Sequence, residues 1–555
     1  MQPSQFRILY RVFLMRVVDL ELLSKDGDPA RLLGQLAALL AGISLTFSLP
    51  LLLIGRVTPE MAAVAEHSLI ALNMVVIGLL SVLSWDAIFP DRRDAMVLSP
   101  LPVAPRTIFL AKAAALTYAI CLSFIALNIF TGLFWASCFS TSDSLLGAVR
   151  AIAVYWVSNA LAAAFVFTAV IAFQGAISQL LPRQIFLRLS APLQMGAFCL
   201  ILGIYILEPS LESTALLSAP VNQSLLAFLP SYWFYALFQQ LNGAPSPVYA
   251  PLAARAGAAL AIALGTAAVT LAISFLRSLR KIAEQPEVLP LNWPAKRSFP
   301  ASHSLPGAVA LFCLRTLLRS AQHRLVVSSY LGGGMAIVLV YVRAIFFQQH
   351  VGRAAAWSRP GTALIIPSLL MLSVAIAALR VVAALPVALR ANWIFRVTEV
   401  HPPEAYLVAV RRAFLLLGAL PVYVVSAVVF LALWPARFAL EHLVVLALLG
   451  CLLTEFCLPG FHKLPFTCSY LPGSGNLQYV FWVVVLLVLP FIGTVARFEL
   501  RMLSNPAGFP AIVAALSILL VLARKRTAVV LRPVSRMLFD EVEPHQILSL
   551  NLNQP

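Results

Sequence analysis

Charge of either sign is scarce in this chain, and acidic residues are the scarcest. Of 555 residues only 11% are charged, with 22 Asp and Glu against 39 Lys and Arg, whereas 61% are hydrophobic. A soluble chain averages about 25% charged residues and encloses its apolar side chains in compact domains. The low charge content therefore excludes an ordinary cytosolic enzyme and a disordered protein.

Metal-binding and nucleotide-binding motifs are missing as well. The seven cysteines are scattered without a Cys-x-x-Cys pair, so neither a zinc site nor a disulfide framework is indicated. No Gly-x-x-x-x-Gly-Lys-Ser/Thr phosphate loop and no His-Glu-x-x-His motif occurs. The glycine run 332–334 has no lysine after it, and small residues within an apolar run favour close helix packing. We therefore expect no metal, no cofactor and no catalytic residue in this chain.

Long apolar runs account for most of the sequence. A membrane helix needs about 20 predominantly apolar residues, and about twelve such runs can be delimited. They lie near 33–55, 67–85, 113–137, 152–175, 191–207, 252–276, 325–347, 362–386, 412–434, 440–458, 477–496 and 509–524. The predicted fold is an all-α polytopic membrane protein.

The net charge of +17 indicates orientation and not binding to nucleic acid. With a cytoplasmic N-terminus, about 29 of the 39 basic residues fall in cytoplasmic segments, and the stretch 208–250 has none. Because Lys and Arg gather on the cytoplasmic side of membranes, both termini are predicted to be cytoplasmic. The expected location is a bacterial inner membrane, with lipid as the surrounding partner.

The runs form two related sets. Each set follows a basic amphipathic stretch, residues 6–22 and 308–324, of the kind that lies in the membrane interface. These stretches recur after about 300 residues, as expected for two fused half-transporters. We expect a first six-span half over 1–276, a proline-rich basic linker over 277–306, a second six-span half over 307–524 and a cytoplasmic tail over 525–555.

Two predicted cytoplasmic loops carry most of the remaining charge. The first, 85–112, mixes charge with aromatic residues and proline, and the second, 387–412, has the same character. Either loop is a solvated connection or a docking surface for a partner, and the recurrence favours docking. The candidate docking residues are Phe89, Pro90, Asp91, Arg92, Arg93, Asp94, Leu101, Pro102, Arg106, Phe395, Arg396, Glu399, Pro402 and Glu404.

The stretch PDRRD followed by LSPLPVAPRTIFLAK, over 90–112, together with the interfacial helix and six spans, resembles the permease subunits of type-2 ABC exporters. The resemblance implies that this leucine-proline loop lies against a separate ATPase subunit, in two copies, which binds ATP and Mg²⁺. In the second half Pro402-Pro403 replaces the Leu-Pro element. The implied function is export of a substrate that is lipid-like or amphipathic, because the spans offer few charges.

A few residues near the span ends are candidates for a gate or for substrate contact. Glu455 falls near the cytoplasmic end of its span, where it either contacts substrate or simply meets the interface. Tyr232 and Trp233 belong to an aromatic cluster in the outer stretch 208–250, either as an aromatic anchor in the outer leaflet or, by resemblance, as part of a re-entrant outer gate. The matching stretch 497–508 is short, so we expect no equivalent element there.

Two other function classes remain as alternatives. A secondary transporter of the major-facilitator kind also has two six-span halves, and Asp91-Arg92-Arg93 lies in its signature loop. The glycines of that signature are missing, however, and we expect no intramembrane carboxylates of a proton relay. A membrane-bound transferase would need clustered acidic residues or histidines at one face, and we expect only isolated carboxylates in the outer loops, such as Asp143, Glu208 and Glu212.

Overall fold

The computed structural model describes most of the chain. The described residues are 3–18, 29–54, 58–85, 98, 101, 103–140, 144–208, 220–244, 246–284, 305–346, 360–383, 385, 403–458, 466, 489–505 and 507–531. Over this part the chain is 92% helical without a strand. Nine helices of the described residues are long and apolar enough to cross a membrane. The chain is therefore an all-helical, multi-pass membrane protein.

The chain divides into two compact units, and each is described by itself. The described residues up to Glu284 belong to the first unit, and those from Leu305 onward belong to the second. The last helix of the first unit continues into the expected linker as far as Glu284. The last helix of the second unit likewise reaches Leu531, inside the expected tail. The rest of the linker to 304 and of the tail lies outside the described residues.

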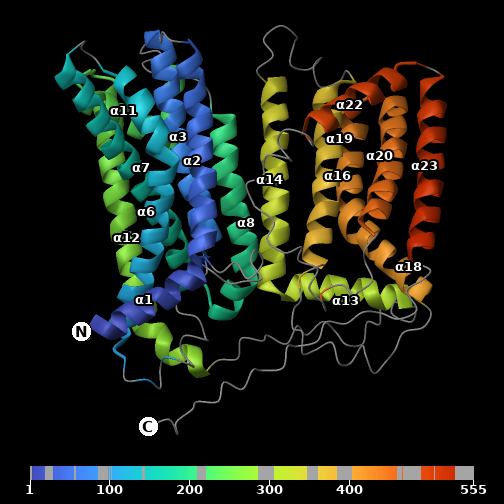
Figure 1. Cartoon of the computed structure of the whole chain (residues 1–555), viewed down its shortest axis with the longest axis horizontal. Coiled ribbons are helices and arrows are strands. Elements are labelled where there is room, and N and C mark those ends of the chain that lie inside the picture. Colours follow the sequence, from blue (N-terminus) through green and yellow to red (C-terminus); the bar gives the residue numbers. More distant parts are fainter. Residues whose placement is uncertain are drawn as a thin grey trace, which may run out of the picture. The chain divides into compact units, whose positions relative to one another are not determined.

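The first unit is a bundle of long helices, and short helices lie at both ends of the bundle (Figure 1). Helix α1, which the sequence predicts to be interfacial, lies across one end of the bundle, against α6, and short α10 and α11 lie at the other end. The elements are α1 (Pro3–Val18), α2 (Pro29–Ile54), α3 (Pro59–Leu83), α6 (Pro105–Cys138), α7 (Leu145–Leu180), α8 (Arg183–Leu207), α10 (Pro220–Phe228), α11 (Pro230–Asn242) and α12 (Tyr249–Glu284).

Local chemistry determines where several of these helices begin and end. Thr58 caps α3, with its hydroxyl oxygen accepting the Met61 N–H at 3.3 Å, and Ser144 caps α7 by accepting the Gly147 N–H at 3.0 Å. Helix α11 ends at Gly243, whose φ of 93° is left-handed and suits glycine. These termini lie at the ends of apolar runs, where exposed backbone groups can reach water.

A neutral hydrogen-bond network joins the long helices of the first unit. Tyr155 of α7 donates to Asn128 of α6 at 3.0 Å, and Asn128 donates to Asn73 of α3 at 3.0 Å. The Ser44 hydroxyl of α2 accepts the backbone N–H of Thr131 at 3.1 Å. Because these groups are buried in an apolar surrounding, satisfying them mutually stabilises one arrangement of the four helices.

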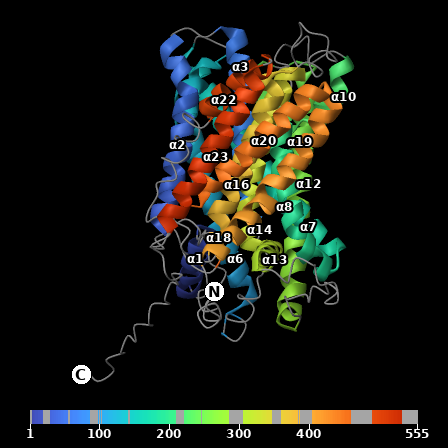
Figure 2. The same cartoon turned by 90° about the vertical axis from the view of Figure 1, so that its right-hand side faces the viewer.

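The second unit repeats the arrangement of an interfacial helix at one end and a short helix at the other (Figure 1). Interfacial α13 packs on α18 as α1 packs on α6, and α20 and α23 run alongside each other (Figure 2). The elements are α13 (Leu305–Arg319), α14 (Ala321–Phe346), α16 (Thr362–Ala383), α18 (Pro403–Phe414), η3 (Leu415–Ala419), α19 (Leu420–Leu433), α20 (Ala436–Cys457), α22 (Leu489–Leu503) and α23 (Gly508–Leu531).

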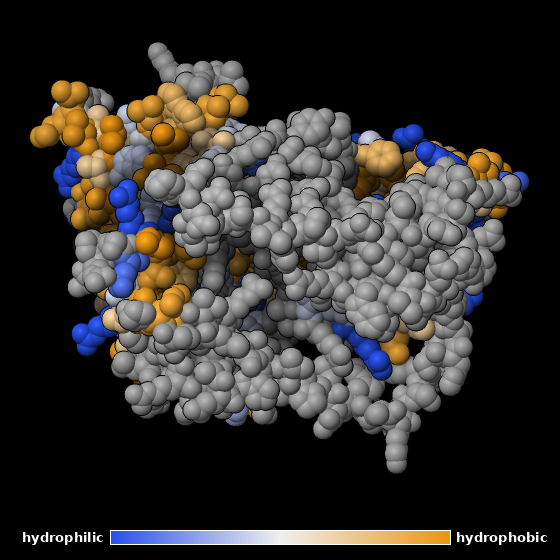
Figure 3. All heavy atoms as spheres, turned by 60° about the horizontal axis from the view of Figure 1, so that its bottom comes forward, coloured by the Kyte–Doolittle hydropathy of each residue, from blue (hydrophilic) through white to orange (hydrophobic). Residues whose placement is uncertain are grey.

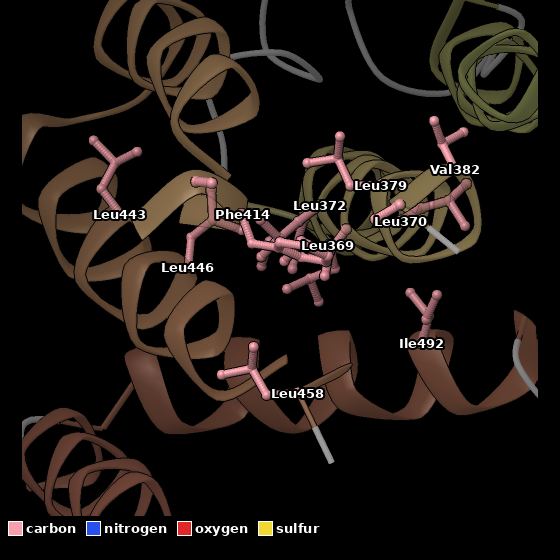
Figure 4. Packing of buried hydrophobic residues seen from close by; sticks show 14 of the residues in the cluster. Leu369, Leu370, Leu372, Leu379, Val382, Phe414, Leu443, Leu446, Leu458 and Ile492 are labelled. Carbon is pink, nitrogen blue, oxygen red and sulfur yellow. The ribbon is translucent and has the colours of Figure 1, made fainter. Parts of the chain in front are cut away.

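Helix α16 is at the centre of the second unit. Its Leu369, Leu372 and Leu379 are buried in one hydrophobic cluster with side chains of neighbouring helices, such as Phe414 and Leu446 (Figure 4). This cluster is hydrophobic throughout, so its contribution is packing and not polar pairing.

Helix packing at the glycine run 332–334 involves Gly334, whereas the sequence predicts a packing face of Ser328, Gly332 and Ala336. A Cβ on Gly334 of α14 would lie 3.2 Å from Met371 Sδ and 3.2 Å from Val374 Cγ1 of α16, whereas a Cβ on Gly333 would meet nothing within 4 Å. Gly334 therefore permits the close approach of α14 to α16.

Large apolar side chains cover the outside of the described helices. Val428 of α19 is 66% exposed, Ile262 of α12 is 69% exposed and Ile518 of α23 is 60% exposed. Figure 3 shows hydrophobic residues over much of the described surface in view, with hydrophilic residues in smaller patches. Apolar surface on this scale is not found on soluble monomers and is suited to lipid.

The expected number of spans is met in part. Of the expected runs, 33–55 and 191–207 hold shorter apolar segments, Leu33–Leu49 and Leu193–Leu207. Most of 477–496 lies outside the described residues, so the count of twelve stays a prediction. The stretch 497–508, for which no equivalent of the aromatic outer element is expected, contains the end of α22, which runs to Leu503 and buries Ile492, Ala496, Glu499 and Leu503 along one side.

Candidate functional site

The first of the two predicted cytoplasmic loops, 85–112, is anchored where it leaves α3. Trp85 is fully buried, and its carbonyl accepts the Gln174 side-chain N–H of α7 at 2.8 Å. The Val82 carbonyl accepts the Gln194 side-chain N–H of α8 at 2.8 Å. Side chains from two helices thus bind the last turn of α3, directly before the loop.

The same loop is anchored again where it enters α6. Leu9 and Phe13 of α1 pack on Ile108 and Ala111 of α6, and the loop residue Leu98 packs on the same cluster. The Lys112 ammonium lies 5.6 Å from the centre of the Phe13 ring, a cation–π contact. A displacement of this loop would therefore act on α1 and α6 together.

Most of the candidate docking residues lie outside the described residues. These are Phe89, Pro90, Asp91, Arg92, Arg93, Asp94, Pro102, Phe395, Arg396, Glu399 and Pro402. Leu101 is 49% exposed and Arg106 is exposed. Glu404 lies in the first turn of α18, and its side chain is outside the described part.

Glu455 of α20 lies in a buried ion-pair network. Its carboxylate is 2% exposed, and its Oε2 accepts Arg411 Nη2 of α18 at 3.0 Å. Arg411 Nε lies 2.5 Å from Oε1, and Arg524 Nε of α23 lies 3.5 Å from the same oxygen. Glu455 therefore connects α20 and α23 to α18, the helix that follows the second cytoplasmic loop.

Between α18 and α19 the helix contains a π-turn, η3. Gly418 in this turn faces α16, and a Cβ there would lie 2.8 Å from Leu379 Cδ1. Single π-turns within α-helices occur frequently at functional sites. Arg411 thus lies on a helix that is separated from the rest of its span by an irregular turn.

At its other end the second unit holds a histidine and a glutamate that sequence reasoning missed. His442 Nδ1 of α20 lies 2.6 Å from Glu499 Oε1 of α22, and both side chains are at most 1% exposed. His442 Nε2 lies 3.0 Å from the Ser368 hydroxyl of α16, which donates to the Ile365 carbonyl at 2.8 Å. Because the Ser368 hydroxyl donates to Ile365, His442 Nε2 donates to Ser368, and His442 Nδ1 shares a hydrogen bond with Glu499.

This serine, histidine and glutamate do not form a hydrolytic site. Ser368 is 5% exposed, and its hydroxyl proton already binds the Ile365 carbonyl. A nucleophile needs access to substrate and a proton that its base can remove. The arrangement is instead a buried, hydrogen-bonded set of side chains that holds α22 against α20 and α16.

The corresponding end of the first unit also buries a histidine beside carboxylates. The Tyr232 ring stacks on His67 of α3 with 4.0 Å between ring centres. His67 Nε2 lies 3.3 Å from Glu208 Oε1 at the end of α8, and the Ser231 hydroxyl donates to that oxygen. Glu66 Oε2 accepts from the Gln239 side chain at 3.0 Å.

The aromatic cluster of α11 faces the protein interior. Tyr232, Phe234, Tyr235 and Phe238 are at most 2% exposed, so the interpretation of these four rings as a lipid anchor is wrong. Trp233 is partly buried, and its indole N–H donates to the Leu226 carbonyl at 2.8 Å. Burial, with the nearby Glu66 charge, raises the pKa of the Tyr235 hydroxyl, so the phenol stays neutral.

Carboxylates other than Glu455 are also buried in the described part, although the sequence predicts no intramembrane carboxylates of a proton relay. Glu66, Glu208, Glu455 and Glu499 are each at most 7% exposed. The described residues contain no group of three or more His, Cys, Asp and Glu side chains that could hold a metal ion. Comparison of the chain with protein-family models, with curated proteins and with solved structures finds no match.

Proposed function

We propose that this chain is the membrane-spanning permease subunit of an ATP-driven exporter of the type-2 ABC kind. Both termini would lie in the cytoplasm of a bacterium, and a separate ATPase, in two copies, would bind the cytoplasmic loops. The observation that supports this most is the anchoring of the first loop at both of its ends, on Trp85 and on the α1–α6 cluster. A partner that moves this loop would thereby move the long helices.

The second unit offers a comparable path for transmitting motion. Helix α18 follows the second loop directly, packs on interfacial α13, and is tied through Arg411 and Glu455 to α20 and α23. A displacement of α18 would strain the buried ion pair unless α20 moves with it, because an unpaired buried charge is costly. The residues suit a mechanical role for Glu455 better than contact with a hydrophilic substrate.

The buried polar groups favour a lipid-like or amphipathic substrate. In the described spans Tyr155, Asn128 and Asn73 of the first unit hydrogen-bond to one another, and the buried Glu455 and Glu499 of the second unit are paired with Arg411 and His442. A large hydrophilic anion would find few free donors along these helices. The substrate proposed here is therefore an amphiphile.

Association with an ATPase tests the proposal. The purified chain is expected to copurify with an ABC ATPase, and changing Asp91, Arg92, Arg93 and Asp94 to alanine is expected to weaken this association without lowering the melting temperature. Replacing Lys296 and Arg297 by alanine, in the expected linker, is the matched control and should leave association intact. Full association and full ATP-dependent transport by the four-alanine variant would contradict the docking assignment.

A proton-coupled secondary transporter remains the second candidate, and the buried pairs His442–Glu499 and His67–Glu208 favour it. Buried ionisable groups in membrane helices are characteristic of proton pathways. Vesicles in which an imposed pH gradient drives transport without ATP would support this candidate. Glu499→Gln should then abolish transport, whereas an exporter powered by ATP would keep its ATP dependence in that variant.

A further inference from the structure

An apolar groove opens on the first unit between α3, α7, α8 and the start of α11. Its volume is about 100 Å³, and its walls include Met74 and Val75 of α3, Phe165 of α7, and Ile201 and Ile204 of α8. In a membrane such a groove is open to lipid chains and not to water. Its walls therefore suit an alkyl chain.

The groove ends at a carboxylate. Glu208 and Ser231 line it at the end where α8 stops and α11 begins, the end opposite α1. Glu208 is 7% exposed, and its Oε1 accepts from Ser231. An occupant of the groove would thus place its chain against α3 and α8 and its polar end beside Glu208.

The carboxylates at this end lack a basic side chain as partner. Glu66 and Glu208 are buried there with one histidine, His67, and among the described side chains no Lys or Arg forms an ion pair with either carboxylate. Glu66 Oε1 is buried without a hydrogen-bond partner. A buried carboxylate without a Lys or Arg partner favours an incoming cation, and Glu208 is the carboxylate that lines the groove.

The polar end of the site is held in place before any ligand binds. Tyr232 stacks on His67 at 4.0 Å and Tyr235 meets the same ring edge-on at 5.7 Å, which fixes the imidazole beside Glu208. Ser231 fixes one carboxylate oxygen. A carboxylate that is already oriented loses little entropy on binding an ammonium group.

We propose that this groove binds a cationic amphiphile, with its alkyl chain between α3, α7 and α8 and its ammonium group on the Glu208 carboxylate. A neutral or anionic amphiphile of the same chain length would fill the groove but would lack the ionic contact. The inference concerns binding alone, so it goes beyond the proposed exporter function and does not depend on ATP.

Photolabelling with hexadecylamine that carries a diazirine in its chain tests the site, in nanodiscs of phosphatidylcholine. Labelling is expected on α8 around Ile201 to Tyr205, and unlabelled hexadecylamine should compete at a concentration at least about tenfold lower than hexadecanol or palmitate, because a charged hydrogen bond strengthens binding by about that factor. Equal competition by the amine and the alcohol would overturn the assignment of Glu208.

Two variants separate the chain site from the charge site. Ile204→Trp, at a wall position that is 39% exposed, should abolish labelling of α8 by filling the groove without removing a polar contact. Glu208→Gln should reduce competition by the amine to the level of the alcohol. Their matched controls in the second unit, Ile518→Trp and Glu441→Gln, should change neither result.

Melting temperatures of all four variants show whether each is folded. Unchanged α8 labelling in a folded Ile204→Trp protein would overturn the groove as the site, whatever the behaviour of Glu208→Gln. Loss of labelling in Ile518→Trp as well would also count against it, because that residue lies on α23 of the second unit and does not line the groove.

Discussion

At the scale of single residues, the buried carboxylates set this chain apart from a simple apolar bundle. Each of them binds a group from another helix, as Glu455 does with Arg411 and Glu499 does with His442. Removing one partner of such a pair costs more than the pair itself contributes, because the remaining charge stays buried. Substituting one of these residues therefore tests how the helices are arranged as well as what the protein does.

Glu455→Gln tests the network around Arg411. Since Arg411 is 19% exposed and Arg524 is 51% exposed, water can hydrate the freed guanidinium groups, and we expect a loss of about 1–3 kcal/mol in the free energy of unfolding. The double variant Glu455→Gln with Arg411→Gln should lose less than the sum of the single variants. Unfolding in mixed micelles by increasing SDS measures both.

The control for this experiment is Glu441→Gln. Glu441 pairs with Arg437 at 2.9 Å, but Arg437 is 63% exposed, so its loss should change the free energy of unfolding by less than about 0.5 kcal/mol. Equal effects at Glu455 and Glu441 would show that burial does not strengthen the first pair.

His323, at the corner between α13 and α14, gives a pH dependence. Burial lowers the pKa of the His323 imidazole, opposed by the Leu385 carbonyl at 3.1 Å from Nε2. The unfolded chain then takes up a proton near pH 6.5 that the folded chain does not, so stability is complete above that pH and falls as the pH drops below it. The melting temperature should decrease from pH 7.5 to pH 5.5, and the decrease should be smaller in His323→Gln. If the melting temperature of His323→Gln decreased as much as that of the unmodified protein, the pH dependence would arise from other groups.

At the scale of elements, the long apolar helices and the amphipathic helices α1 and α13 were predictable, whereas α22 was not. A bilayer requires a long apolar run, and such runs can be found in a sequence without knowing their partners. Helix α22 was missed because Arg497, Glu499 and Arg501 interrupt its apolar stripe. The burial of Glu499 depends on His442, which lies on another helix, and no local pattern encodes such a distant pair.

Close packing of α14 on α16 can be tested with adjacent glycines. Gly334→Leu would place its Cβ 3.2 Å from Met371 Sδ, whereas Gly333→Leu would have open space. We expect a loss of about 1–3 kcal/mol in the free energy of unfolding for the first substitution only. Both lose the same glycine flexibility, so a similar effect of the two would refute tight packing at Gly334.

At the scale of the whole molecule, composition predicted the class and the charge distribution predicted the orientation. The described helices confirm a multi-pass membrane protein. Most of the candidate docking residues lie outside the described part. The docking proposal therefore depends on the contacts at the ends of the loops, such as those of Trp85 and of the α1–α6 cluster. What could be inferred from the sequence is thus the environment of the chain, and the pairs of distant residues required the fold.

Reporter fusions test the predicted orientation. Fluorescent protein that folds only in the cytoplasm should fluoresce when fused to either terminus and should stay dark when inserted between Ser210 and Pro220, because basic residues are concentrated in the segments assigned to the cytoplasm. Fluorescence from the inserted reporter, with dark termini, would reverse the orientation.

The π-turn between α18 and α19 has a consequence for the register of the helix. A π-turn is equivalent to one extra residue within an α-helix, and each residue of an α-helix advances the chain by about 100°. Deleting one residue within Leu415–Ala419 could therefore restore a regular helix while rotating everything before it by about that angle. This rotation would move the Arg411 side chain away from Glu455. The one extra residue of the π-turn therefore lets the helix before it and the helix after it each face its own neighbours.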